Sequence, residues 1–382
     1  MNAPFNAYIR HLSSWMNRCP DSTVSCDPAA KSEREFNSLA VELFDLQCVH
    51  NAVYRDLCRS RGVSPGSLTS WRALPAMPAA AFKEEPVTCL AENEVTTTFC
   101  SSGTTGQVPS RHFHGPSSLA VYEASFLPWF GRQALENWNG SLIGGILETT
   151  NPLQWVSLVP PRAAAPSSSL AYMVSALLDR FGGNSVSVCG SIGGGGEWVV
   201  DGQRVIDSLD QAMLSGRPVM ILGTAFNLVH LFDRLMDAGR RFRLPPGSRV
   251  METGGYKGRS RTLTPAELAE GIQSLLGISF DGLLTEYGMS ELSSQAYARW
   301  PGPSGPGELG FPGWARPQVI SPETGGEVAE GETGLLRIVD LANVASVLCL
   351  QTEDLVVRRG DGFQLLGRRP AAEARGCSLT SV

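Results

Sequence analysis

The sequence predicts an α/β protein whose layered sheets carry helices on their faces, followed by a small β-rich lobe. Short apolar runs alternate with helical patterns between residues 141 and 285, as in sheets covered by helices. The composition then changes at 301–317, a loop rich in Gly and Pro, and short strands with Gly turns follow it. We therefore expect an α/β core over residues 1–300, a β-rich lobe over 301–366 and a polar tail over 367–382.

The N-terminal third predicts one long helix, an extended connection and then a strand followed by a helix. Residues 32–62 carry apolar side chains at helical spacing. Residues 71–86 contain three prolines and predict an extended connection. Residues 94–100 are rich in Thr and β-branched side chains and predict a strand, and a helix is expected from about 116 to 134.

The remaining elements follow from short apolar runs and helical patterns. In the core, strands are expected at 141–147, 156–159, 186–188, 199–200, 219–222 and 280–285. Helices are expected between these strands at 168–181, 204–215, 225–240 and 265–276. In the lobe, strands are expected at 333–341, 345–350, 354–358 and 363–366.

Composition and charge exclude several classes of protein. Of the 382 residues, 42% are apolar and 18% are charged, which is typical of a globular chain. The formal charge of −6, without basic blocks, argues against nucleic acid as a partner. The first 18 residues lack the apolar run of a secretory signal, and no stretch approaches the roughly 18 apolar residues of a membrane span. We expect a cytoplasmic protein.

The residue types available for chemistry are few. The nine cysteines include no CxxC pair, and with five histidines they give no zinc-ligand spacing. Lysines number three, at positions 31, 83 and 257, so any reaction that needs an ammonium group has three candidates.

The segment Ser101–Gly106 has the composition of a phosphate-binding loop. It places four hydroxyl residues and two glycines in six positions. Glycine lets the backbone approach an anion, while hydroxyls and backbone amides donate hydrogen bonds to phosphate oxygens. The Lys of a Walker A loop is absent, so this is a different type of loop. Such a cluster alone is often no more than a turn, and the wider pattern decides its meaning.

Four segments occur in an order that resembles the acyl-adenylate-forming superfamily. Residues 101–106, with the sequence SSGTTG, resemble its phosphate loop, and residues 286–291, EYGMSE, resemble its YGxTE motif. Residues 352–354, TED, stand where the family carries TGD, and residues 367–368, GR, resemble the start of its hinge motif. The resemblance implies the α/β fold of the adenylate-forming N-terminal domain.

The resemblance also implies an ATP site. It places the β- and γ-phosphates against hydroxyls and backbone amides of Ser101, Ser102, Gly103, Thr104, Thr105 and Gly106. The adenine and acyl pockets would be lined by a glycine-rich segment containing Gly254 and Gly255, and adenine would stack on Tyr287. Further contacts to the nucleotide are expected from Gly288, Ser290 and Arg368.

Two carboxylates complete this expected site. Asp354 would accept hydrogen bonds from the ribose hydroxyls, and Glu291 would bind Mg²⁺, a hard cation that prefers oxygen ligands. The site therefore requires the hydroxyl-rich loop and Glu291 to meet. His112 and His114 would share one strand face near the triphosphate, although histidines with a structural role are commoner.

The C-terminal domain that carries the catalytic lysine of most such enzymes is expected to be largely absent. The chain ends 15 residues after Gly367. We hypothesise that Lys257, which lies in a predicted site loop, replaces that lysine; the alternative is a solvated loop lysine.

Cys377 is the cysteine most suited to covalent chemistry. It lies in a polar, Gly-flanked tail beside Arg375, whose charge favours the thiolate. The closest likeness is to the acyl-protein synthetases of bacterial luminescence (LuxE-type), in which a cysteine near the C-terminus carries the acyl group. An exposed tail cysteine without a role is the alternative.

Three functions remain open. The first is an acyl-protein synthetase that adenylates a fatty acid and passes the acyl group to Cys377 and then to a partner, such as an acyl reductase. The second is an aromatic-acid adenylating enzyme, since the same branch includes ligase-like proteins of phenazine pathways. The third is a catalytically idle nucleotide-binding scaffold. The final acceptor of the acyl group distinguishes the first two functions. The scaffold differs from both because it would show no pyrophosphate exchange with any carboxylic acid.

Overall fold

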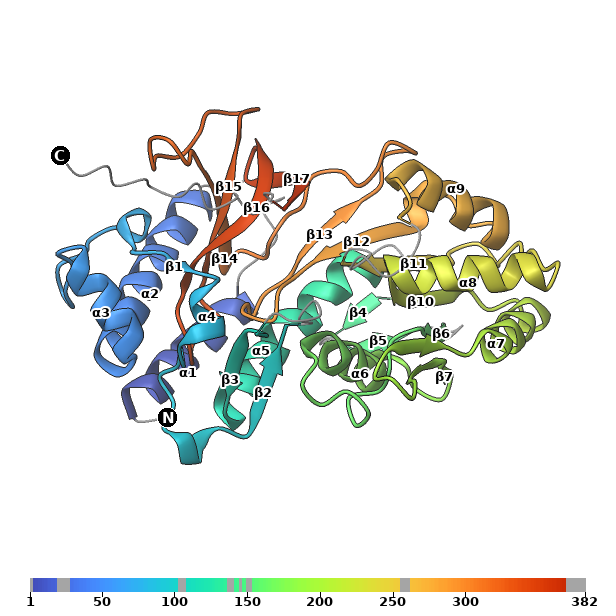
Figure 1. Cartoon of the computed structure of the whole chain (residues 1–382), viewed down its shortest axis with the longest axis horizontal. Helices are drawn as coiled ribbons and strands as arrows, with labels where there is room; N and C mark the ends of the chain where they lie inside the picture. Colours follow the sequence, from blue (N-terminus) through green and yellow to red (C-terminus); the bar gives the residue numbers. More distant parts are fainter. Residues whose placement is uncertain are drawn as a thin grey trace, which may run out of the picture.

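The computed structural model describes residues 3–18, 28–101, 108–135, 141–143, 146–148, 153–254 and 262–368. It forms two large sheets with helices packed against them and three two-stranded hairpins. Figure 1 shows the N-terminal helices beside the C-terminal strands. The predicted α/β class and the β-rich C-terminal part are confirmed; the domain boundaries stay a prediction. None of the described helices is both long enough and apolar enough to span a membrane.

The N-terminal helices are α1 (Ala3–Arg18), α2 (Pro28–His50) and α3 (Ala52–Ser60). The single helix expected over 32–62 is therefore wrong, because Asn51 interrupts it. Asn51 has an extended backbone, its side-chain oxygen accepts from Tyr54 N at 3.0 Å, and its side-chain nitrogen donates to Ser346 O at 3.3 Å. An N-cap that also bonds to a distant segment outweighs the helical pattern.

The larger sheet has six strands in the order β13-β12-β11-β10-β6-β7. Its parallel strands are β6 (Gln154–Ser157), β7 (Val186–Val188), β10 (Val219–Thr224), β11 (Arg249–Thr253) and β12 (Leu283–Tyr287). The antiparallel strand β13 (Ala296–Arg299) forms the edge beside β12.

Helices cover both faces of this sheet, and each face has its own apolar cluster. On one face lie α7 (Gly202–Ser215), α8 (Ala225–Asp237) and α9 (Pro265–Leu276). On the other face lie α5 (Pro116–Phe130) and α6 (Ser169–Phe181). The functional edge is the one where the parallel strands end, because ligands in such sheets bind at the carboxyl ends of the strands.

The second sheet has five strands. It contains β1 (Met77–Pro78), β14 (Ala315–Ile320), β15 (Thr333–Asp340), β16 (Cys349–Arg359) and β17 (Gly362–Arg368). The two strands expected at 345–350 and 354–358 are wrong as separate elements: β16 runs from Cys349 through all of 354–358, and most of 345–350 lies before it in a turn. The strand β1 pairs parallel to β16, so residues 77–78 join the C-terminal lobe.

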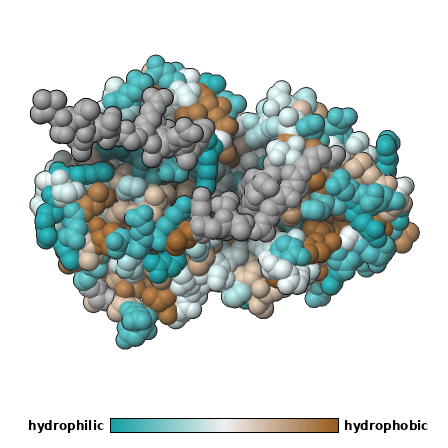
Figure 2. All heavy atoms as spheres, in the orientation of Figure 1, coloured by the Kyte–Doolittle hydropathy of each residue, from teal (hydrophilic) through white to brown (hydrophobic). Residues whose placement is uncertain are grey.

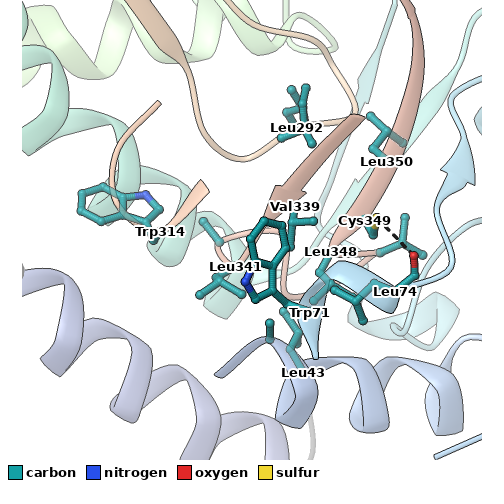
Figure 3. Packing of buried hydrophobic residues seen from close by; sticks show 14 of the residues in the cluster. Leu43, Trp71, Leu74, Leu292, Trp314, Val339, Leu341, Leu348, Cys349 and Leu350 are labelled. Atoms are coloured by element: carbon teal, nitrogen blue, oxygen red, sulfur yellow. Dashed lines mark hydrogen bonds between the residues drawn. The ribbon is translucent and has the colours of Figure 1, made fainter. Parts of the chain in front are cut away.

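Side chains from the N-terminal helices fill the core beneath this second sheet. Figure 3 shows Leu43 of α2, Trp71 and Leu74 packed with residues of β15 and β16, and Leu292 in the same cluster. Cys349 is 1% exposed, and burial raises the pKa of its thiol to about 12, so it is inert as a nucleophile at neutral pH. Leu292 directly follows Glu291, so its burial in this cluster anchors the segment that carries Glu291.

The remaining elements are short. A hairpin of β2 (Thr97–Cys100) and β3 (Arg111–His114) precedes α5. The connection expected to be extended over 71–86 contains η1 (Trp71–Ala73), β1 and the short helix α4 (Ala81–Glu84). The other elements are η2 (Glu92–Glu94), η3 (Gly131–Leu135), β4 (Ser141–Ile143), β5 (Ile146–Glu148), β8 (Gly190–Ile192), β9 (Trp198–Val200) and η4 (Phe280–Gly282).

The surface visible in the orientation of Figure 1 is mixed. Figure 2 shows mostly hydrophilic or neutral residues there, with hydrophobic residues in separate small patches. Single exposed apolar side chains are normal for globular proteins and indicate no docking surface by themselves.

Candidate active site

The hydroxyl-rich loop begins and ends on the hairpin of β2 and β3. Ser101 N donates to Ser110 O at 3.2 Å, and Ser110 N donates to Ser101 Oγ at 2.9 Å. These two bonds close the base of the loop. The predicted phosphate ligands Ser102, Gly103, Thr104, Thr105 and Gly106 lie outside the described residues.

The segment after β12 meets this hairpin. His112 Nδ1, on β3, lies 2.7 Å from Ser290 O. Because a carbonyl can only accept, His112 Nδ1 carries the proton and donates it. The residue after Ser290 is Glu291, so the structure brings the base of the loop and Glu291 together although 190 positions separate Ser101 from Glu291.

The histidines are interior groups. His112 and His114 are at most 2% exposed, and their ring nitrogens Nδ1 and Nε2, respectively, lie 3.3 Å apart. Burial lowers the pKa of His112 to about 4 and that of His114 well below its ordinary value. Both rings are therefore neutral at pH 7, and His112 serves to hold the Ser290 carbonyl.

Glu291 is 6% exposed, and its neighbours counteract the effect of this burial on its pKa. Burial raises the pKa of its carboxyl, while Ser110, Arg368 and Lys83 act in the opposite direction. Ser110 Oγ makes no hydrogen bond among the described residues, so it acts on Glu291 only as a nearby dipole. A carboxyl at the loop base with cations beside it is suited to sharing a divalent ion with phosphate oxygens.

Tyr287, Asp354 and Arg368 form a second part of the site. Tyr287 OH donates to Asp354 Oδ2 at 2.6 Å, and Arg368 Nε donates to Asp354 Oδ1 at 3.2 Å. Burial and the Asp354 carboxylate hold the pKa of Tyr287 well above its usual range. Three residues expected to bind the nucleotide are thus in direct contact, although Tyr287 and Asp354 lie on different sheets.

The ring of Tyr287 is held at a fixed angle. It lies edge-on to Phe363, with ring centroids 5.4 Å apart, and to Phe311, with centroids 6.3 Å apart. The side chain is 7% exposed. The aromatic packing and the bond to Asp354 fix the ring next to Gly288, where the sequence places the nucleotide.

Lys83 is a site residue that the sequence did not assign. It is exposed on α4, which packs against β3, and the preceding Phe82 lies edge-on to His112 with ring centroids 6.0 Å apart. The same segment is joined to β16 by a bond from Ala79 N to Gln351 O of 2.9 Å. The sequence identified Lys83 as one of only three lysines, but it did not show that this lysine lies close enough to Glu291 to lower the pKa of its carboxyl.

Lys257 and Cys377, the two residues assigned to catalysis, lie outside the described residues, as does Gly255. Gly254 is described and has φ of +66°, a left-handed backbone conformation that favours glycine. No group of three His, Cys, Asp or Glu side chains able to bind a metal occurs within the described ranges. An ion at Glu291 would therefore depend on the nucleotide for most of its ligands.

A buried polar network holds the segment that carries Glu291. Asp340 Oδ2 accepts from Ser293 N at 2.9 Å, and its Oδ1 accepts from Ser294 Oγ at 2.7 Å. Asn343 Nδ2 donates to Glu291 O at 2.9 Å. Burial raises the pKa of Asp340 to about 6 despite these hydrogen bonds. Sequence patterns gave no reason to select Asp340 or Asn343.

Two further buried carboxyls end the neighbouring strands β11 and β12. Glu252 pairs with Thr285 in register and accepts from its hydroxyl at 2.6 Å, while Glu286 pairs with Thr253 and accepts from that hydroxyl. Because side chains alternate along a strand, the two glutamates point to opposite faces of the sheet. Burial raises the pKa of each to about 7.

Comparison with known proteins agrees with the motifs. No family model matches the sequence. The chain is 20% identical over 340 residues to the long-chain-fatty-acid–luciferin-component ligase of Vibrio harveyi, over 87% of this chain and 83% of that protein.

Solved structures give the same result at the level of the fold. The chain aligns with 2-hydroxyisobutyryl-CoA ligase in the postadenylation state, in complex with 2-HIB-AMP, with a TM-score of 0.64 and 15% identity, over 92% of this chain and 72% of that one. An open conformation of that ligase with 2-HIB-AMP and CoA gives a TM-score of 0.62 over 92% and 80% of the two chains. The chain has the fold of the acyl-adenylate-forming ligases, as the motifs predicted.

Proposed function

We propose that the protein is an ATP-dependent ligase that activates a carboxylic acid as an acyl-adenylate. One observation carries the proposal: the base of the hydroxyl-rich loop, Glu291 and the Tyr287–Asp354–Arg368 group converge from four separate segments. The fold and the relative named as a ligase support it. A scaffold without activity would have no need to keep Glu291 buried beside the loop.

In the proposed reaction, a carboxylate oxygen of the acid attacks the α-phosphorus of ATP. The bond from that phosphorus to the bridging oxygen breaks, and pyrophosphate leaves with the electron pair. Two anions must meet, so the protein contributes by aligning them and neutralising charge. Adenine would lie against Tyr287, and the ribose hydroxyls would donate to Asp354.

Arg368 can give way to the ribose. Its side chain is 74% exposed, and its pairing with Asp354 is worth little in water. The Asp354 oxygen that it occupies would then accept a ribose hydroxyl instead. Tyr287 OH keeps the other oxygen in place through the 2.6 Å bond.

Glu291 would hold Mg²⁺ together with phosphate oxygens from ATP. The ion would supply charge neutralisation at the phosphates. The residues present fit it, because Glu291 is a carboxyl that stands at the base of the hydroxyl-rich loop, next to the Ser290 carbonyl bonded to His112. Lys83, exposed on α4 near Glu291, would add a point charge for the same phosphates.

The acyl acceptor and the acid are finer proposals. The V. harveyi relative is named for a long-chain fatty acid, which supports a fatty acid here, and an aromatic acid is the alternative. In the transfer step, the thiolate of Cys377 would attack the acyl carbon, and the bond to the AMP oxygen would break. The thioester would then pass to a partner, such as an acyl reductase.

The test is carboxylate-dependent exchange of pyrophosphate into ATP across a panel of aliphatic and aromatic acids. We expect exchange with at least one acid, and its loss in Glu291→Ala. Thioester label on Cys377, found by mass spectrometry, would support the acyl-protein reaction; free products would support the aromatic-acid alternative. A folded protein that shows no exchange with any acid would disprove adenylation and leave the scaffold function.

A further inference from the structure

Glu286, Gln295 and Tyr297 form a compact polar group on the face of the large sheet covered by α5 and α6. Glu286 on β12 is the register partner of Tyr297 on β13. A Cβ at Gly288 would lie 2.4 Å from Glu286 Oε1 and 3.4 Å from Gln295 Cγ, so the carboxyl and the amide side chain flank one point. The three side chains are between 3% and 5% exposed.

This group has more hydrogen-bonding capacity than the protein uses. Among the described residues, neither Gln295 Oε1 nor Tyr297 OH has a hydrogen-bond partner, and both atoms are buried. Glu286 accepts from Thr253, and no other hydrogen bond to its carboxyl is found among the described residues. A buried polar atom without a partner costs about 1–3 kcal/mol, so unpaired atoms that lie together are what a binding site for a polar group requires.

The group lies where the acid would be activated. Glu286 directly precedes Tyr287, which is bonded to Asp354, and Thr253 directly precedes Gly254 at the end of β11. Both glutamate and threonine stand at the carboxyl ends of parallel strands, where ligands bind in such sheets. Tyr122 of α5 lies near Gln295, which acts to lower the pKa of the Tyr122 phenol against the effect of burial.

We propose that these three residues recognise a hydrogen-bond-donating substituent, an amino or hydroxyl group, on the carboxylic acid that is adenylated. The proposal rests on the proposed function. Gln295 Oε1 and the Glu286 carboxyl are acceptors, and Tyr297 OH can accept as well as donate. An unsubstituted alkyl chain would leave Gln295 Oε1 and Tyr297 OH unpaired and Glu286 with the Thr253 bond alone, whereas a donor on the substrate would add the missing partner.

The experiment compares acids of equal length with and without an amino or hydroxyl substituent, by kcat/KM in pyrophosphate exchange. A site built to hydrogen-bond a substrate group discriminates strongly against analogues that lack it, so we expect a preference of roughly tenfold or more for the substituted acid. Glu286→Gln and Tyr297→Phe should each reduce this preference several-fold. Glu286→Leu should favour the unsubstituted acid.

Glu252→Gln is the matched control. Glu252 stands one strand away at nearly the same height, is similarly buried and bonds to a threonine, but points to the opposite face. Its substitution should leave the preference ratio unchanged. Thermal melts of each variant identify those that fail to fold. Tyr297→Phe is the least disruptive of them, because it removes a single oxygen atom.

Two results separate failure of this inference from failure of the proposed function. Exchange that proceeds equally well with unsubstituted acids, or a ratio unchanged in both Glu286→Gln and Tyr297→Phe, would mean that the unpaired atoms bind water, and the inference would be wrong while adenylation stands. The absence of exchange with every acid in a folded protein would disprove adenylation itself.

Discussion

Glu291 shows how single residues decide the chemistry of this site. Burial raises the pKa of its carboxyl, and Arg368 and Lys83 lower it through their charges. A carboxyl must be ionised to bind a divalent cation, so these neighbours set the lowest pH at which the site can work. Both cations come from segments far from Glu291 in the sequence.

Replacing Lys83 tests its part in the site. In Lys83→Met we expect KM for Mg·ATP to rise about tenfold, since an ammonium near phosphate oxygens is worth roughly 1–2 kcal/mol. The acid limb of the pH profile should also move to higher pH, because loss of the cation raises the pKa of Glu291 further. Steady-state exchange kinetics between pH 5 and 8 would show both effects.

Lys83→Arg and Lys257→Ala are the companion variants. Lys83→Arg keeps the charge and should retain the pH profile. If Lys257→Ala abolishes exchange while Lys83→Met leaves KM and the pH profile unchanged, the cation is Lys257, as the sequence suggested. Exchange unchanged in Lys257→Ala would reject that assignment.

At the scale of elements, the segment between β12 and β13 is held by the β2–β3 hairpin, by the end of β15 and by the turn that follows β15. His112 of β3 holds the Ser290 carbonyl at 2.7 Å, Asn343 holds the Glu291 carbonyl at 2.9 Å, and Asp340 of β15 holds Ser293 N at 2.9 Å. The backbone on both sides of the Glu291 side chain is thus fixed. We regard Asp340 and Asn343 as positioning residues.

Asp340→Asn tests this positioning. An amide offers one acceptor where the carboxylate offers two, so either Ser293 N or the Ser294–Ala342 pair loses its acceptor. We expect the Mg²⁺ concentration for half-maximal exchange to rise several-fold, with a smaller change in the KM for the acid. Titration of Mg²⁺ at saturating ATP measures it.

Two further variants keep the test of positioning interpretable. Ser294→Ala removes one donor to Asp340 Oδ1, which still accepts from Ala342 N at 3.0 Å, and also removes the hydroxyl that lies 2.9 Å from Ser125 Oγ. It should give a weaker effect of the same kind. Ser208→Ala removes a buried hydroxyl from α7, remote from the site, and should give none. An equal effect on Mg²⁺ and on the acid would indicate general loss of structure instead of positioning.

The paired strands β11 and β12 predict a pH dependence of stability. The pKa of Glu252 is raised from 4.5 to about 7 in the folded protein. The folded state therefore binds more protons than the unfolded state between these values, and its contribution to stability is lost as pH rises from about 4.5 to about 7. Glu252→Gln has no carboxyl to ionise. Its free energy of unfolding relative to the wild type should increase across this window by about 1 kcal/mol or more.

Denaturant unfolding at pH 5 and pH 8 measures this difference. Glu353→Gln, which changes an exposed carboxyl on β16, is the control and should show no such trend. A difference between Glu252→Gln and the wild type that is the same at both pH values would contradict a raised pKa for Glu252.

At the scale of the whole molecule, the N-terminal helices and the C-terminal sheet form one apolar core. Gln47 of α2 joins them in the interior: its side-chain nitrogen donates to Asn343 O at 2.8 Å, and its side-chain oxygen accepts from Leu348 N at 2.8 Å. Asn343 in turn holds Glu291. The helices at the start of the chain thus support the site through the residues that position it.

Gln47→Ala should destabilise the protein by about 2–4 kcal/mol, because it leaves two buried backbone groups unpaired. Urea unfolding followed by circular dichroism measures this. Gln203→Ala, at an exposed position of α7 where the side chain bonds to Asp207, is the matched control and should change stability by less than about 0.5 kcal/mol. Equal effects of the two substitutions would show that the hydrogen bonds between Gln47 and the C-terminal lobe do not contribute to the free energy of unfolding.

The sequence by itself determined the fold class, the order of the four motifs and most of the residues expected to bind nucleotide. These features are local: alternating apolar patterns fix strands and helices, and short motifs keep their spacing whatever surrounds them. Tyr287, Asp354 and Arg368 were selected in this way, and the structure brings them into contact.

The tertiary structure decided what depends on contacts between distant segments. The break between α2 and α3 follows from the bond between Asn51 and Ser346, and Lys83 approaches Glu291 because β1 pairs with β16. The hydrogen bonds of Asp340, and the unpaired atoms of Gln295 and Tyr297 beside Glu286, likewise result from packing. Burial, pairing and pKa shifts are set by neighbours in space, and a one-dimensional pattern does not contain those neighbours.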